Sequence, residues 1–209
     1  MASKLWIWFL LEACAAANAA APPPPLADAV ALFRHKKYAE ARAILEPIVA
    51  ADPSNAAASY YLGMTLLRAG GPSSLDSAQV LLARAVRLAP GDAGYLADYA
   101  GVCLLMADRD NSFGLAVEGR DAMTRAIAAN PADLEARAGL MQFYAKAPWP
   151  LGDADKAMDL AAEIARRDPK RGIAAYRSAE AIFRRNGMDN EALAAGQAAQ
   201  RLAQGPPQR

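Results

Sequence analysis

The chain has 209 residues, enough for one or two ordinary domains and a sizeable core. Its 23 Lys and Arg nearly balance 22 Asp and Glu, so the formal charge of +1 argues against a dedicated nucleic-acid binder. Alanine makes up about a quarter of the residues and aromatic residues only 7%, a composition that favours closely packed helices over a β-sandwich or barrel.

Residues 1–19 have the pattern of a bacterial secretory signal peptide. Lys4 precedes the apolar run Leu5 to Leu11, and a small-residue region ends in Ala17-Asn18-Ala19. We therefore expect cleavage after Ala19 and a periplasmic or secreted mature chain. An uncleaved membrane anchor is the less favoured alternative, because the apolar stretch is shorter than the roughly 20 residues of a transmembrane helix and Glu12 interrupts it.

Cys14 leaves a third alternative open, a lipid-anchored protein of the envelope. Leu11 to Cys14 is similar to the lipobox of bacterial lipoproteins, in which the cysteine is acylated, although Glu12 stands where that motif prefers a small or apolar residue. In either case Cys103 remains unpaired, which excludes a disulfide scaffold. Residues 20–25 end in four prolines and are expected to form a stiff spacer.

A repeating helical pattern fills residues 26–203. Pro53, Pro90, Pro131 and Pro169 are spaced by 37, 41 and 38 residues. Twelve residues before each proline stands a very small residue, and an apolar stripe with helical spacing follows it. The small residues are Ala41, Ala78, Gly119 and Ala157.

A second helix follows each proline. Asn55, Asp92 and Asp133 stand two residues after their prolines as good N-caps, whereas Arg171 breaks this run in the last unit. The pattern predicts units of two antiparallel helices, with residues 204–209 as a disordered tail.

The units resemble the tetratricopeptide repeat (TPR) family, whose unit is about 34 residues long. The segment that follows the family pattern best comprises Leu62, Gly63, Leu66, Ala78, Leu82, Ala85 and Pro90. The resemblance implies an all-α, right-handed superhelical solenoid of about five antiparallel helix pairs, with atypical units at its ends. The periods are longer than the family's, and we expect the extra residues to form loops along one edge at 70–76, 108–118 and 147–155.

Groups for catalysis or metal binding are not clustered in the sequence. The single histidine, His35, is expected in a solvated turn, and Cys103 falls on a buried stripe. No phosphate-binding loop and no metal-ligand spacing occurs. We expect neither enzymatic activity nor a cofactor or metal.

The resemblance implies a concave groove lined by the first helix of each pair, where the family holds a peptide or a helix. Basic residues occupy four of five equivalent groove positions, the exception being Leu105, and two tyrosines and a methionine lie one or two turns earlier. An acidic or C-terminal peptide is the expected ligand, with long basic side chains that only cover helix ends as the alternative. The candidate groove residues are Arg34, Tyr60, Met64, Arg68, Lys146, Tyr176 and Arg184.

Two aromatic residues, Phe113 and Trp149, fall in the expected loops and are candidate anchors for a partner. Trp149 alternatively fills the gap in packing that Pro148 and Pro150 leave. The sequence thus predicts a non-catalytic protein-interaction scaffold of the bacterial envelope with a protein or peptide partner. The alternatives are an accessory or solute-binding component of an envelope transporter, and a membrane-tethered lipoprotein assembly factor. Homo-oligomerisation is left open, because the last helix could pack on the stack or on another copy.

Overall fold

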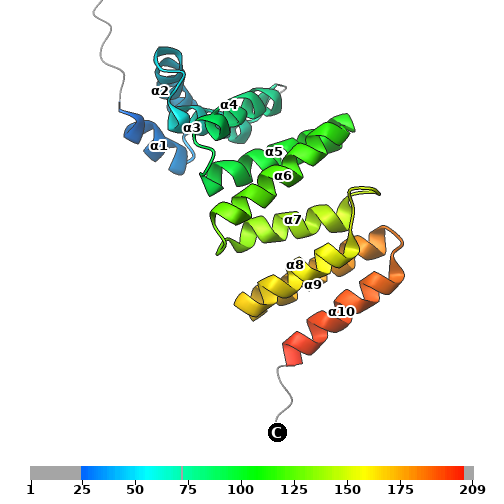
Figure 1. Ribbon diagram of the computed structural model, residues 1–209. Coiled ribbons are helices and arrows are strands. Elements are labelled where there is room, and N and C mark those ends of the chain that lie inside the picture. The colour runs from blue at the N-terminus through cyan, green and yellow to red at the C-terminus, as the bar shows by residue number, and fades with distance from the viewer. Residues whose placement is uncertain (1–24, 72, 205–209) are drawn as a thin grey trace, which may run out of the picture.

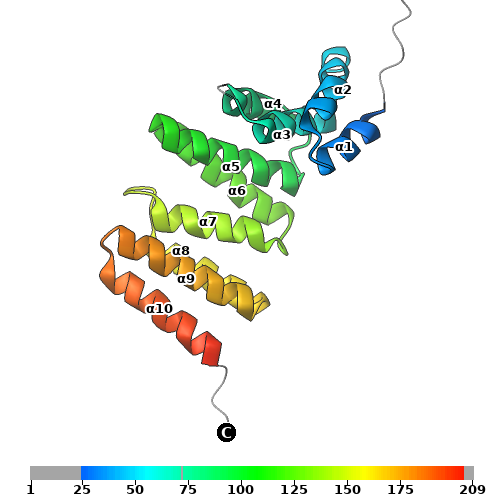
Figure 2. The same ribbon diagram turned by 180° about the vertical axis from the view of Figure 1, so that it is seen from behind.

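The computed structural model describes residues 25–71 and 73–204, and these residues form ten helices. The helices are α1 (Leu26–Arg34), α2 (Tyr38–Ala51), α3 (Ala56–Ala69), α4 (Ser74–Leu88), α5 (Ala93–Asp110), α6 (Phe113–Ala129), α7 (Leu134–Lys146), α8 (Ala154–Arg167), α9 (Pro169–Arg185) and α10 (Asp189–Gln204). They follow one another as five antiparallel pairs from one end of an elongated stack to the other (Figures 1 and 2). The all-α solenoid of five helix pairs is therefore confirmed.

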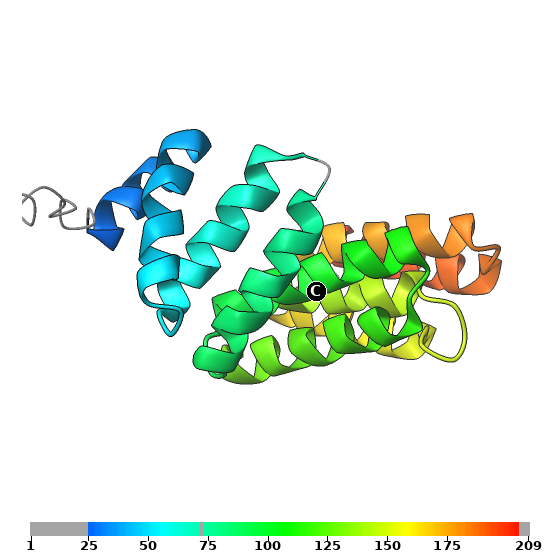
Figure 3. The same cartoon turned by 90° about the horizontal axis from the view of Figure 1, so that it is seen from above.

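The stack turns along its length. Viewed from above, the helices of the first two pairs run at a large angle to those of the last three (Figure 3). The expected signal peptide, the spacer up to residue 24 and residues 205–209 lie outside the described residues. None of the described helices combines the length and the hydropathy that a membrane span requires.

The expected N-caps begin their helices as the sequence indicates. The side chains of Asn55, Asp92 and Asp133 each accept a hydrogen bond from the backbone N–H of the third helical residue. In the last pair Asp168 takes this role, and Pro169 is the first residue of α9 instead of a turn residue. Proline suits this first position because its fixed φ matches the helix and the missing N–H has no intrahelical partner there.

The small residue of each unit is buried where two helices approach closely. Ala41, Ala78 and Ala157 are fully buried. At Gly119, an added Cβ would lie 2.8 Å from the Leu104 side chain and 3.1 Å from the Ala100 carbonyl oxygen. A larger side chain at these positions would force the two helices apart.

The hydrophobic core consists of three clusters of buried residues that follow one another along the stack. Leu62 packs with the first two pairs, whereas Met64 on the same helix packs with the second to fourth pairs. On α7, Leu140 and Met141 are similarly divided between the central core and the core of the last two pairs. Each pair therefore depends on its neighbours for burial, as expected for a repeat protein.

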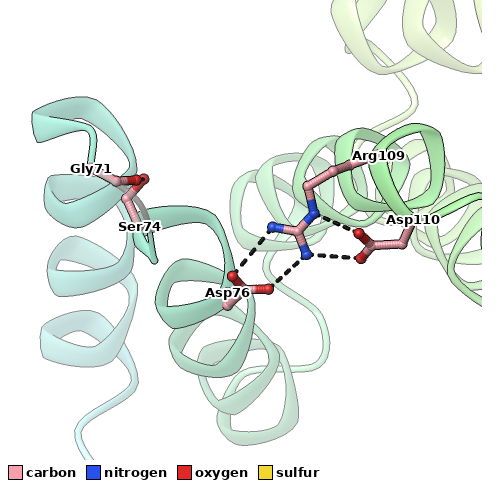
Figure 4. A network of polar contacts seen from close by, with 5 residues as sticks. All are labelled: Gly71, Ser74, Asp76, Arg109 and Asp110. Carbon is pink, nitrogen blue, oxygen red and sulfur yellow. Dashed lines mark hydrogen bonds and ion pairs between the residues drawn. The ribbon is translucent and has the colours of Figure 1, made fainter.

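The turns within the pairs share one edge of the stack, as predicted. At this edge Arg109 of α5 bonds the Asp76 carboxylate of α4 at 2.8 and 3.2 Å and also bonds Asp110 (Figure 4). The Arg109 guanidinium holds the pKa of both carboxyls below the ordinary range. Because all three groups are exposed, this network aligns the edge more than it stabilises the fold.

The prediction of a second loop at residues 108–118 is wrong. Only Asn111 and Ser112 lie outside helices there, and the extra residues lengthen α5 and α6 to 18 and 17 residues. Asn111 ends α5 in the left-handed conformation, which asparagine tolerates, and the Ser112 hydroxyl caps α6. The other two loops are confirmed but are shorter than expected, because α4 begins at Ser74 and α8 begins at Ala154. Residue 72 of the first loop lies outside the described residues.

The last helix packs on the stack. α10 runs antiparallel to α9, and an added Cβ at Gly196 would lie 3.1 Å from the Glu180 carboxyl group of α9. Ala192, Ala195 and Ala199 bury the inner face of α10. The last helix therefore packs on α9 of its own chain.

Candidate functional site

The first helices of the five pairs carry a row of equivalent positions, one in each pair, whose side chains are exposed. This row, called the A-helix row below, contains Arg34, Arg68, Leu105, Lys146 and Arg184. All five side chains are exposed, although their neighbours one turn earlier range from buried to exposed. The regular spacing along the sequence therefore places one exposed side chain near the end of the first helix of each pair.

The charges of the A-helix row are unevenly compensated. Lys146 Nζ lies 3.0 Å from the Asp108 carboxylate, and Arg184 lies 2.6 Å from Glu180. Within residues 25–71 and 73–204, Arg34 and Arg68 form no ion pair. The uncompensated positive charge of the row thus lies in its N-terminal half, over α1 and α3.

The three predicted apolar contacts of the groove are not brought together. Met64 is only 4% exposed and packs in the central core. The third pair covers it, so its prediction as a groove contact is wrong. Tyr176 lies among α8, α9 and α10, three pairs away from Tyr60 along the stack.

Tyr60 has a structural role between the second and third pairs. Its hydroxyl donates a 2.5 Å hydrogen bond to Asp98, and its ring stacks on Tyr95 at 4.3 Å. Burial and the Asp98 carboxylate raise the pKa of Tyr60 far above its ordinary value. These contacts hold the tyrosine in one position at the joint between α3 and α5.

The loop between α7 and α8 projects an aromatic side chain from a well-fixed backbone. Asp153 N–H donates to the Tyr144 carbonyl oxygen at 2.9 Å, and Gly152 N–H donates to that of Pro148 at 3.0 Å. Trp149 is nevertheless 89% exposed, so the alternative that it plugs a gap is wrong. It stands at the rim of a hollow of about 520 Å³ that includes Asn186 and Met188 from the next pair.

Replacing Trp149 by alanine is expected to change the free energy of unfolding by no more than about 0.5 kcal/mol, because its side chain is already in solvent. Denaturant unfolding measures this change. Gly152→Ala is the matched variant in the same loop. It should destabilise the protein, because an added Cβ would lie 1.9 Å from the Ala147 carbonyl oxygen. Substantial destabilisation by Trp149→Ala would contradict the exposed position.

Phe113 is the first residue of α6 and does not lie in a loop as expected. It is 59% exposed at the same edge as the loop between α7 and α8. Its prediction as an exposed aromatic residue is therefore correct, and its predicted local structure is wrong.

Buried titratable groups have structural partners in this fold. Tyr99 donates its hydroxyl hydrogen to Glu118, and the buried Arg137 bonds Glu163 at 3.1 Å and the Asp133 carbonyl oxygen at 2.9 Å. His35 is exposed at the end of α1, as predicted. Among the described residues, no group of three His, Cys, Asp or Glu side chains is placed to hold a metal ion.

Cys103 is expected to be inert toward thiol reagents in the folded protein. Its side chain is fully buried, and burial raises the pKa of its thiol to about 11, so little thiolate forms near neutral pH. Iodoacetamide labelling followed by peptide mapping should find Cys103 unmodified in buffer and modified in denaturant. Rapid labelling of the folded protein would contradict the buried position.

Part of the site was missed from the sequence. Glu180 stands four residues before Arg184, a spacing that predicts an ion pair on a helix. Asp108 precedes Lys146 by 38 residues, close to the repeat length, and this spacing was the available signal for a contact between pairs. Both carboxylates reduce the positive charge that was expected along the groove.

Comparison with solved structures shows the same fold in other proteins, whereas no family model and no curated protein matches the chain. A structure of the MamA protein has a TM-score of 0.68 and 21% sequence identity, covering 86% of this chain and 90% of that one. YrrB, described as a TPR protein with an unusual peptide-binding site, has a TM-score of 0.68 and 18% identity, with 88% of each chain covered.

A third similar structure belongs to an enzyme. It is an O-GlcNAc transferase mutant of Thermobaculum terrenum, with a TM-score of 0.56 and 26% identity over 68% of this chain. The match covers only 25% of the transferase. These likenesses show a shared fold and no more, because the sequence identities are low and the enzyme is matched over only a quarter of its length.

Proposed function

We propose that this chain, which has the tetratricopeptide repeat fold, is a non-catalytic scaffold that holds an acidic peptide or helix of a partner protein along its A-helix row. The supporting observation is that all five equivalent side chains of the row are exposed. The described peptide-binding site of YrrB, a protein of the same fold, is consistent with this use of the surface.

The uncompensated charges indicate where an acidic segment would bind first. Arg34 and Arg68 have no carboxylate partner among the described side chains, so they retain their capacity for charge-assisted hydrogen bonds. Leu105 follows in the next pair and is 57% exposed, which adds an apolar contact. An acidic segment with an apolar residue toward one end fits the order of two arginines followed by a leucine.

A photo-crosslinking residue at position 68 tests the proposal in cells that express the protein. We expect a discrete crosslinked partner that is lost when Arg34 and a second row residue, Lys146, are changed to Glu. The matched control position is Val80, which is 56% exposed on α4, a second helix of its pair. Equal crosslinking from both positions, or crosslinking that survives the charge reversal, would exclude the row as the binding surface.

We further propose that the chain acts in the bacterial envelope. The support is the pattern of residues 1–19, in which Lys4, the apolar run and Ala17-Asn18-Ala19 follow the order of a signal peptide. Intact mass of the protein recovered from cells tests this location. A chain that begins at Ala20 supports a free exported scaffold, a lipid-modified Cys14 supports a tethered one, and an unprocessed Met1 would exclude both.

A further inference from the structure

A second hollow, of about 750 Å³, lies at the opposite edge of the stack from the loop between α7 and α8. Its lining residues come from the C-terminal halves of α8 and α10 and the N-terminal half of α9. These three helices lie at one end of the stack (Figures 1 and 2). The hollow is open to solvent and is not an enclosed cavity. Its lining residues include none of the A-helix row.

The wall of this hollow is mainly apolar. Ala162, Ala165 and Ala198 keep it wide because their side chains are small, and Pro169 and Leu202 add apolar surface. Such a wall favours an apolar side chain over a small hydrated ion.

Two arginines converge on the same hollow from different helices. Arg166 extends from α8 and Arg201 from α10, and Tyr176 of α9 lies in the lining with them. The pKa of Tyr176 is raised, mainly by burial and also by the Asp159 carboxylate. The guanidinium groups of Arg166 and Arg201 lower this pKa and so partly oppose the increase. Both arginines therefore lie close enough to the tyrosine to influence its hydroxyl.

Neither arginine has an ion-pair partner in the part of the chain that the structure describes. Two other arginines of α8 and α9 do have ion-pair partners. Arg167 pairs with Glu163, and Arg171 pairs with Glu135. Both arginine side chains are exposed, so a carboxylate that binds at this hollow would form charge-assisted hydrogen bonds with them.

We propose that this hollow binds an acidic segment of a partner protein. A carboxylate of the segment bonds Arg166 and Arg201, and the next apolar side chain packs against Leu202 and the alanines. Charge complementarity selects the carboxylate, and the apolar wall selects a peptide over a free inorganic anion. The site is separate from the A-helix row, so a scaffold of this kind holds two segments at opposite parts of its surface.

Fluorescence polarisation with a labelled short peptide that alternates Asp and Leu tests the proposal on the chain that begins at Ala20. We expect saturable binding that weakens with salt. Arg166→Gln and Arg201→Gln should each weaken it about tenfold, as expected for the loss of one charge-assisted hydrogen bond. Arg185→Gln is the matched control, because Arg185 is exposed on α9 outside the hollow, and it should leave binding unchanged.

Several outcomes would overturn this proposal. Equal loss in the Arg185→Gln variant would mean that the peptide binds by general charge. Unchanged affinity when the peptide leucines become serines, or competition by inorganic phosphate at the peptide's own concentration, would mean that only an anion is recognised. Binding that appears only after residues 205–209 are removed would mean that the chain's own tail occupies the hollow. Peptide binding is measured in a chain that also carries Arg34→Glu and Arg68→Glu, which removes the A-helix row as a competing site for acidic peptides. Loss of all binding in this background would overturn the proposal.

Discussion

Replacing Gly172 by alanine is expected to lower the free energy of unfolding by about 3 kcal/mol or more. An added Cβ would lie 2.4 Å from both Cα and Cβ of Ala165 and 3.0 Å from its backbone nitrogen. Two of these three atoms belong to the α8 backbone, so no side-chain rotation can relieve the overlap. The helices α8 and α9 would have to separate, and the fourth and fifth pairs would lose their close contact.

Gly101→Ala is the matched control for this prediction. Gly101 also lies inside a helix, α5, but an added Cβ there meets no atom within 4 Å. The substitution is expected to stabilise the protein by about 0.5–1 kcal/mol, because alanine loses less conformational entropy than glycine in a helix. Thermal unfolding of both variants should therefore give midpoint changes of opposite sign, with a decrease of about 6 °C or more for Gly172→Ala. Changes of the same sign would contradict the close approach of α8 and α9.

Replacing Phe183 by alanine is expected to cost about 3–5 kcal/mol of stability. Phe183 is fully buried in the core of the last two pairs, where the other buried residues include Met141 and Ile164. Most other members of this core are alanines, which cannot extend into the space that the ring would leave. A cavity should therefore remain, and its cost adds to the lost transfer free energy of the ring.

The effect of Phe183→Ala should be concentrated at one end of the stack. Each pair of a repeat protein contacts only its neighbours, so hydrogen exchange should increase first in α8, α9 and α10. Leu105→Ala serves as the control, because Leu105 is 57% exposed and its loss should change stability by no more than about 0.5 kcal/mol. Equal destabilisation by both variants, or uniform exchange along the chain, would contradict this description of the core.

The helix pairs could be predicted because their signals are local. Asn55, Asp92 and Asp133 cap the helices that follow them through side-chain contacts only three residues away. The very small residues of the second helices could be found because a position that tolerates at most a methyl side chain repeats in four units. The same local reasoning failed at residues 108–118, where an added stretch extended two helices because Asn111 and Ser112 provide a compact turn.

The candidate surfaces could be predicted only in part. The members of the A-helix row could be predicted because they occupy the same position in each unit. All five side chains are exposed, as expected for equivalent positions. The degree of burial one turn earlier could not be read from the same spacing. Met64 is buried because the third pair packs over it, whereas its equivalent in the fourth pair, Gln142, is exposed.

The sequence by itself determined the all-α class, the five helix pairs and the row of exposed side chains, because caps, periodicity and small residues act within a few residues of one another. Only the tertiary structure decided which charges of the row are compensated, that Trp149 projects into solvent, and that Arg166 and Arg201 meet at one hollow. Those outcomes depend on how neighbouring pairs rotate and pack against each other. Contacts between neighbouring pairs, such as the hydrogen bond from Tyr60 to Asp98, follow from that packing and have no local signal in the chain.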